Sequence, residues 1–207
     1  MRPLPRVHAI TDARVLELDD LGVRAAAIAA GGPSVALHAR DSAATGRKLA
    51  AASSRFVALA RPPEASVLVN GRPDIARATG AQGVQLRAGD LAPGEARHVM
   101  PAGWIGSSVH SFEEAHAARA AGTDFLMVGN IYPTPSHPAL SGQGLQLIVR
   151  CAGLGIPVIA IGGITPERAR EVRAAGAYGV ASISSLWYAA DPAEVVLALL
   201  APWLDDA

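Results

Sequence analysis

The sequence has little cysteine and no excess of either charge. Cys151 is the single cysteine among 207 residues, which excludes a disulfide within the chain, and we interpret it as a small apolar side chain on a helix. Eighteen Lys and Arg residues balance eighteen Asp and Glu residues. The composition therefore gives no electrostatic basis for binding nucleic acid or an acidic membrane surface.

Long apolar runs are missing too, although half of the residues are apolar. No run approaches the length of a membrane span, and the first residues do not join a basic segment to an apolar one. We therefore predict neither a membrane helix nor a signal peptide, and we expect a cytoplasmic protein. The length and the apolar content predict one globular domain, residues 1–207, with a substantial core.

The sequence does contain strand-like and helix-like segments that alternate from end to end. The apolar segments that we interpret as strands are residues 7–11, 34–39, 66–70, 83–86, 104–110, 124–129, 158–161 and 179–183. The helical segments are residues 16–30, 43–61, 74–79, 94–99, 112–121, 144–152, 167–175 and 192–204. Eight strands, each followed by a helix, predict an α/β protein with a (β/α)₈ TIM barrel. A doubly wound open sheet is the alternative, but no Gly-x-Gly-x-x-Gly motif follows the first strand.

The end of the seventh predicted strand indicates an anion site. The apolar run 158–161 ends in a pair of glycines, and Thr165-Pro166-Glu167 is typical of a helix start. Free backbone N–H groups at such a junction can bind phosphate. Barrels commonly hold a phosphate at the ends of strands seven and eight. The predicted phosphate-binding residues are Gly162, Gly163, Ser182, Ile183 and Ser184.

Polar residues also follow the other strands, where a barrel places its active site. Because side chains two residues apart share one face of a strand, His38 should lie on the side of Arg40, and Ser108 on the side of His110. We predict His110 as the catalytic residue, since an imidazole near pH 7 can both accept and donate a proton. The predicted substrate-binding residues are His38, Arg40, Asn70, Ser108, Asn130 and Thr134.

A metal site is not predicted. Asp90 is a single carboxylate at a strand end, and Asn70 is followed by Gly71 rather than by an acid. One carboxylate is weak support for Mg²⁺, which usually takes one or two together with substrate phosphates. The Gly-x-Ser-x-Gly motif of a serine nucleophile does not occur either.

Several segments together resemble the thiamine phosphate synthase/TenI family. They are Ala9–Asp12, Val69–Asn70, Gly83–Leu86 with Asp90, Gly106–Glu114, Val128–Thr134 and Ile156–Thr165. These segments span nearly the whole chain in the order that the family has. The resemblance implies a (β/α)₈ barrel that binds a thiazole phosphate at the ends of strands seven and eight. It also implies a role in thiamin biosynthesis and a homodimer.

Two activities compete within this family. Thiamine phosphate synthase joins a pyrimidine diphosphate to the thiazole phosphate and displaces diphosphate with Mg²⁺, so a synthase would use Asp90 for the metal. Its Gln-Leu-Arg-Glu-Lys strand is Ala36–Arg40 here, its Asn-Asp pair is Asn70-Gly71, and its Thr-Pro-Thr-Lys loop is Thr134–His137. The lost acid and lysine weaken this assignment, because diphosphate departure depends on charge at its oxygens.

A TenI-type thiazole tautomerase needs none of these groups. It is an isomerase that moves a proton on a thiazole phosphate carboxylate with a histidine in a Ser-Val-His-Ser segment, which is Ser108–Ser111 here. We therefore predict a tautomerase without a cofactor, in which His110 relays the proton and His38 or Arg40 faces the carboxylate. Gln143 stands where the family has a basic residue. A synthase is the alternative, and a non-catalytic regulatory ligand-binding protein is a further one.

Overall fold

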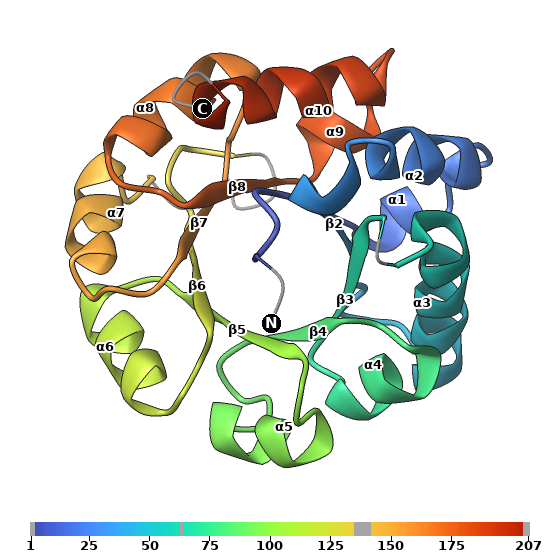
Figure 1. The fold of residues 1–207 in the computed structure, drawn as a ribbon, viewed down its shortest axis with the longest axis horizontal. Helices are drawn as coiled ribbons and strands as arrows, with labels where there is room; N and C mark the ends of the chain where they lie inside the picture. Colours follow the sequence, from blue (N-terminus) through green and yellow to red (C-terminus); the bar gives the residue numbers. More distant parts are fainter. Residues whose placement is uncertain (1–2, 63, 135–141, 205–207) are drawn as a thin grey trace.

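The apolar strand segments form parallel strands that close into a barrel in the computed structural model (Figure 1). The structure describes residues 3–62, 64–134 and 142–204. The strands are β1 (Val7–Ile10), β2 (Val35–Ala39), β3 (Ser66–Asn70), β4 (Gly83–Leu86), β5 (Trp104–Val109), β6 (Phe125–Val128), β7 (Val158–Ile161) and β8 (Gly179–Ser182). Each strand pairs with the next along the chain, and β8 pairs with β1. The predicted (β/α)₈ barrel is confirmed, and the open sheet is excluded.

Helices cover the outside of this barrel (Figure 1). They are α1 (Ala13–Leu16), α2 (Leu21–Ala29), α3 (Gly46–Ala60), α4 (Pro73–Thr79), α5 (Pro93–Val99), α6 (Phe112–Ala120), α7 (Leu145–Ala152), α8 (Pro166–Ala174), α9 (Ser184–Trp187) and α10 (Pro192–Leu200), with the 3₁₀ turns η1 (Gly32–Ser34) and η2 (Ala201–Trp203). In the part of the chain that the structure describes, no helix has the length and apolar character needed to cross a membrane.

The helices differ from the prediction most clearly after β1 and after β8. The sequence predicts one helix over residues 16–30, whereas α1 ends at Leu16 and α2 begins at Leu21. Asp12 caps α1 by accepting a hydrogen bond from the backbone N–H of Val15 at 2.9 Å, so the first helix begins earlier than predicted. The helix α9 is not predicted at all, because four residues are too few to show a helical period.

Both faces of the barrel sheet are buried. Outward side chains such as Val7, Ala9 and Leu37 pack against the helices in one continuous apolar core. The apolar side chains inside the barrel are Ile10, Ala36, Leu68, Trp104, Phe125, Met127, Ile159 and Ala181. Because neither face meets water, the strands read as consecutive apolar residues rather than as an alternating pattern. The barrel interior is therefore filled, which leaves ligand binding to its ends.

Two histidine side chains lie inside this filled interior. His8 and His38 are fully buried, and His8 Nδ1 lies 2.8 Å from His38 Nε2. His8 Nε2 lies 3.0 Å from the carbonyl oxygen of Pro5, and His38 Nδ1 lies 3.1 Å from the carboxamide of Asn70. Burial lowers the pKa of both imidazoles, helped at His8 by the neighbouring His38, and brings that of His38 to about 4. Both rings are therefore neutral at pH 7.

Neutral rings set the direction of these hydrogen bonds. A carbonyl oxygen only accepts, so His8 Nε2 carries the hydrogen and His8 Nδ1 accepts from His38 Nε2. His38 Nδ1 is then an acceptor and needs an N–H donor from Asn70. The Asn70 atom that faces it is Oδ1, which is also an acceptor. Turning the carboxamide over gives every contact one donor and one acceptor. The buried histidine pair therefore orients Asn70 at the end of β3.

We predict that acid destabilises the fold through these two histidines. An unfolded histidine has a pKa near 6.5 and folded His38 one of about 4, so the unfolded chain binds more protons between these values. The contribution of His38 should be complete above pH 6.5 and should fall by roughly 3 kcal/mol as the pH drops to about 4. Urea unfolding at a series of pH values measures this change.

A double variant separates the buried histidines from other titrating groups. His8→Leu combined with His38→Leu should lose most of the pH dependence between these limits. His116→Gln, at an exposed histidine of α6, should keep it. If the wild type and the double variant showed equal slopes, the buried pair would not be the origin of the acid sensitivity.

Candidate functional site

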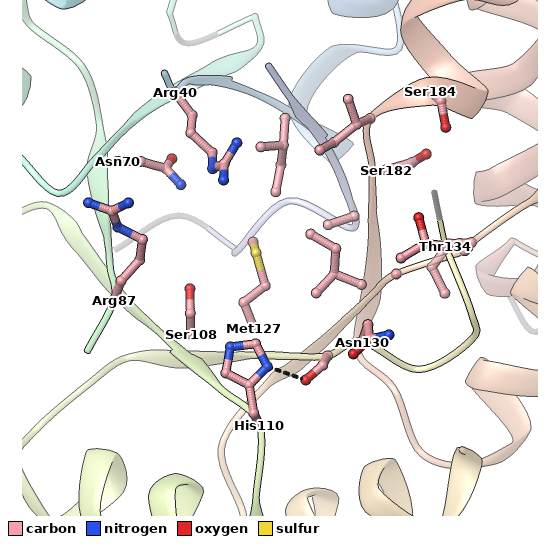
Figure 2. A pocket seen from close by; sticks show the side chains of 18 residues that line it. Arg40, Asn70, Arg87, Ser108, His110, Met127, Asn130, Thr134, Ser182 and Ser184 are labelled. Atoms are coloured by element: carbon pink, nitrogen blue, oxygen red, sulfur yellow. Dashed lines mark hydrogen bonds between the residues drawn. The ribbon is translucent and has the colours of Figure 1, made fainter. Parts of the chain in front are cut away.

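A cavity of about 230 Å³ lies at the carboxyl ends of the strands (Figure 2). It has two polar ends and an apolar floor between them. The sequence-predicted residues that line it are Arg40, Asn70, Ser108, His110, Asn130, Thr134, Gly162, Gly163, Ser182, Ile183 and Ser184. The structure therefore gathers nearly all of the predicted site residues at one end of the barrel.

His38 does not line this cavity. Arg40 follows Ala39, the last residue of β2, whereas His38 lies within the strand and is fully buried. Both side chains point to the inner side, as the two-residue period predicts, but they differ in depth by about 7 Å along the strand. His38 therefore faces His8 and Asn70 in the barrel interior, and the arginine reaches the cavity.

The glycine pair after β7 forms a tight turn at one end of the cavity. Gly162 and Gly163 have φ angles of +98° and +63°, and a Cβ atom on Gly162 would lie 2.5 Å from the Cβ atom of Asn130. The backbone N–H of Tyr132 donates to the Gly162 oxygen at 3.0 Å, and Arg168 Nη1 donates to the Gly163 oxygen at 2.6 Å. These bonds fix both peptides of the turn.

The end of β8 completes this end of the cavity. Ser185 Oγ donates to the carbonyl oxygen of Ile164 at 3.0 Å, which joins the loops after β7 and β8. Within the described residues, the backbone N–H groups of Gly163 and Ser184 have no hydrogen-bond acceptor. Two free N–H groups and the hydroxyl of Ser184 can bind an anion, whereas the Ser182 hydroxyl donates to Ser185 Oγ. We call these residues the amide end.

The opposite end of the cavity is cationic. Arg40 and Arg87 come from the ends of β2 and β4, and Asn70 from the end of β3 lies between them (Figure 2). Burial, and then the positive charge of Arg87, lowers the pKa of Arg40. Arg87 pairs with Asp90, whereas the Arg40 side chain forms no hydrogen bond to any described residue. We call Arg40 and Arg87 the arginine end.

His110 lies at the end of β5, at the edge of the cavity. Its Nδ1 is 2.6 Å from the carbonyl oxygen of Gly129 (Figure 2), and Nδ1 donates this hydrogen bond because a carbonyl oxygen only accepts. Its backbone N–H donates to Glu114 Oε2 at 2.7 Å, which anchors it to the first turn of α6. With Nδ1 used in this way, Nε2 is the ring nitrogen left to a ligand, and it is a hydrogen-bond acceptor in the neutral form of the ring.

The sequence prediction misses the floor of the cavity and one of its cations. The apolar lining residues are Ile10, Met127, Ile161, Ile164 and Ala181. Ile10, Met127 and Ala181 belong to the inward face of their strands, so the two-residue period could identify them once a barrel is assumed. Arg87 follows the fourth predicted strand and lines the cavity, but it is not among the predicted substrate-binding residues. His137 lies outside the described residues.

The arginine end does not offer the ligands of a divalent-cation site. Asp90 supplies one carboxylate, whose Oδ2 accepts from the Arg87 backbone at 2.8 Å and whose Oδ1 accepts from Arg87 Nη2 at 3.4 Å. Gly71 beside it has no side chain to contribute. Over the described ranges, no three His, Cys, Asp or Glu residues are grouped to hold a metal. This donor set does not fit Mg²⁺, which prefers several free oxygen ligands.

Comparison with known proteins identifies the family of this chain. The thiamine monophosphate synthase family matches residues 7–186. The thiamine-phosphate synthases of Salinispora arenicola and Salinispora tropica are 37% and 39% identical over 206 residues, covering 97% of this chain and 98% of each relative. The solved structure of thiamine phosphate pyrophosphorylase from Pyrococcus furiosus is 31% identical with a TM-score of 0.81, covering 97% of this chain and 96% of that one.

These comparisons correct the activity predicted from the sequence. The relatives are named synthases, which are transferases, so the prediction of a TenI-type thiazole tautomerase, an isomerase, is wrong. His110 does not discriminate between the two activities, because the Gly129 carbonyl and Glu114 hold it in place whatever the reaction. The resemblance itself is confirmed over most of the length of the chain. This protein belongs to the thiamine monophosphate synthase/TenI family.

Proposed function

We propose that this protein is a thiamine-phosphate synthase, a transferase that joins a pyrimidine diphosphate to a thiazole phosphate. The observation that carries the proposal is a single cavity with two different anion-binding ends. Gly163 and Ser184 offer backbone N–H groups at one end, and Arg40 and Arg87 offer guanidinium groups at the other. Two phosphorylated small molecules that react with each other need such a pair of ends. The names of the relatives agree with this assignment.

Each end suits a different group of the substrates. The thiazole phosphate keeps its charge during the reaction, and neutral N–H groups hold it at the amide end. The C–O bond between the pyrimidine methylene carbon and the diphosphate breaks, and its electron pair leaves with the diphosphate. The lone pair of the thiazole nitrogen forms the new C–N bond. The arginine end stabilises the charge that develops on the leaving diphosphate.

The floor of the cavity keeps the two rings together. Ile10, Met127 and Ala181 present apolar surface between the two ends, which excludes water from the carbon that loses the diphosphate. Ser108 accepts a hydrogen bond from Gln85 Nε2 at 3.0 Å, so its own hydrogen is free to reach a ring. His110 offers an acceptor and takes a binding role, because the bond changes above need no proton transfer.

The family resemblance implies Mg²⁺, but the steps above use only side chains and backbone groups of this chain. The donor set at Asp90 does not fit the ion, so we assign no step to it. The homodimer, the cytoplasmic location and the single domain over residues 1–207 stay predictions.

A direct assay tests the proposed function. The protein is incubated with hydroxymethylpyrimidine diphosphate and thiazole phosphate, in Mg²⁺ and in EDTA, and thiamine phosphate is measured by its conversion to a fluorescent product. We expect thiamine phosphate to appear at a rate proportional to enzyme. A protein that binds both substrates and yet forms no thiamine phosphate in either buffer would contradict the proposal and favour a regulatory role.

A substitution in the amide end should weaken thiazole phosphate binding selectively. Gly163 has a φ angle of +63°, and a Cβ atom there would lie 2.8 Å from Tyr132 Cβ and 2.9 Å from the Pro133 oxygen. Gly163→Ala should therefore displace the N–H group that faces the phosphate. The KM for thiazole phosphate should rise about tenfold, the loss of one charge-assisted hydrogen bond, while the KM for the pyrimidine diphosphate stays unchanged. Initial rates at varied substrate concentrations measure both constants.

Gly80→Ala is the matched control for this substitution. Gly80 has a φ angle of +76° after α4, and a Cβ atom there would meet nothing within 4 Å. It carries a similar backbone strain of about 1–2 kcal/mol without touching the cavity. If both variants raised the KM for thiazole phosphate equally, the effect would come from stability and not from the amide end.

A further inference from the structure

The end of β3 and the loop after β4 meet closely at the arginine end. Gly71 directly follows β3 and has a φ angle of +74°. A Cβ atom on this glycine would lie 3.2 Å from Asp90 Oδ2 and 3.3 Å from Oδ1. Any acidic side chain at this position would therefore stand against Asp90 and form a pair of carboxylates with it. The glycine leaves Asp90 as a single acid.

Arg87 uses both oxygens of that single acid. Its backbone N–H and its Nε donate to Asp90 Oδ2 at 2.8 and 3.4 Å, and its Nη2 donates to Oδ1 at 3.4 Å. The Asp90 side chain is 14% exposed and that of Arg87 is 46% exposed, and Arg87 lines the cavity, so the ion pair lies at the cavity wall. A cation that approached Asp90 would have to displace Arg87 and would meet its positive charge.

Arg40 adds a second guanidinium to the same end. The carboxylates nearest to it electrostatically are Asp12 and Asp41, and both have other partners. Asp12 caps α1 through Val15, and Asp41 lies 3.8 Å from Lys48. The five N–H donors of Arg40 are thus available to a ligand, and its repulsion with Arg87 is relieved when an anion binds between them.

We propose that Arg40 and Arg87 bind the diphosphate of the substrate directly and that this binding does not need a divalent cation. The inference rests on the proposed function for the identity of the ligand. Planar guanidinium groups bind phosphate oxygens through two parallel hydrogen bonds, and they carry the positive charge that a metal would otherwise supply. The pair formed by Arg87 and Asp90 occupies the place where a pair of carboxylates could hold the metal.

Calorimetric titration of the 207-residue chain with inorganic pyrophosphate tests this inference. We expect pyrophosphate to bind in EDTA with an affinity within about threefold of that in Mg²⁺. Arg40→Gln should weaken binding about tenfold or more, because a charged hydrogen-bond donor is lost, and Arg40→Lys should recover only part of the affinity. Arg72→Gln removes an equal charge from an exposed residue that pairs with Asp74, and it should have no effect. Pyrophosphate binding that appears only with Mg²⁺ would overturn the inference.

A variant that rebuilds the pair of carboxylates gives a second, independent test. Gly71→Asp combined with Arg87→Gly places two acids together and removes the guanidinium between them, and aspartate tolerates a positive φ better than most residues. This variant should lose pyrophosphate binding in EDTA and regain it in Mg²⁺. Binding in EDTA at the wild-type affinity would overturn the inference. A thermal melt of each variant shows that it is folded.

The two proposals fail in distinguishable ways. Pyrophosphate binding is measured without the thiazole phosphate and without turnover, so it reports on the arginine end alone. Absence of thiamine phosphate in every buffer, together with pyrophosphate binding in EDTA, overturns the proposed function and supports the cation-independent site. Formation of thiamine phosphate only with Mg²⁺, together with Mg²⁺-dependent pyrophosphate binding, supports the proposed function and overturns the cation-independent site.

Discussion

The pairing of β8 with β1 is the constraint on which the rest of the structure depends. Val7 pairs with Val180 and Ala9 with Ser182, and this register closes the sheet. Closure brings the carboxyl ends of all strands to one rim, so Arg40 and Ser184, far apart in the sequence, line one cavity. An open sheet would leave β1 and β8 as separate edges. The position of the site is thus a property of the closed ring of hydrogen bonds rather than of any one loop.

The two ends of the cavity recognise anions by different physical means. At the amide end the donors are backbone N–H groups, and the sequence shows them only as Gly162 and Gly163, the residues that allow the turn. At the arginine end the donors are the side chains of Arg40 and Arg87, which carry full charge. Backbone N–H groups at fixed positions suit a phosphate that stays bound during the reaction. Guanidinium groups suit a diphosphate that gains negative charge as it leaves. A ligand with two anionic parts is therefore oriented by the cavity.

The sequence predicts the barrel and most of the lining residues, because both follow from short-range patterns. Apolar runs define the strands, and polar residues such as Asn70 and Asn130 follow them directly. The sequence does not show how deep a side chain lies in the barrel, or which side chains contact each other. His38 and Arg40 share a strand face, yet one packs beside His8 and the other reaches solvent. The contact between Arg87 and Asp90 depends on the direction of their side chains in a loop, and the spacing of residues in the sequence does not predict that direction. The sequence shows the acid lost at Gly71, but it does not show that Arg87 pairs with the remaining Asp90.

The barrel interior takes part in the site through Asn70. The Pro5 carbonyl requires the hydrogen of His8 to be on Nε2, so His8 Nδ1 accepts and the hydrogen of His38 is on its Nε2. His38 Nδ1 then requires an N–H group from the Asn70 carboxamide. The carboxamide oxygen is then turned toward the cavity, at the end where the unpaired donors of Arg40 lie. Because burial lowers the pKa of both histidines, protonation cannot reverse this order near neutral pH. This chain of hydrogen bonds inside the barrel therefore sets which atom of Asn70 a ligand meets at the arginine end.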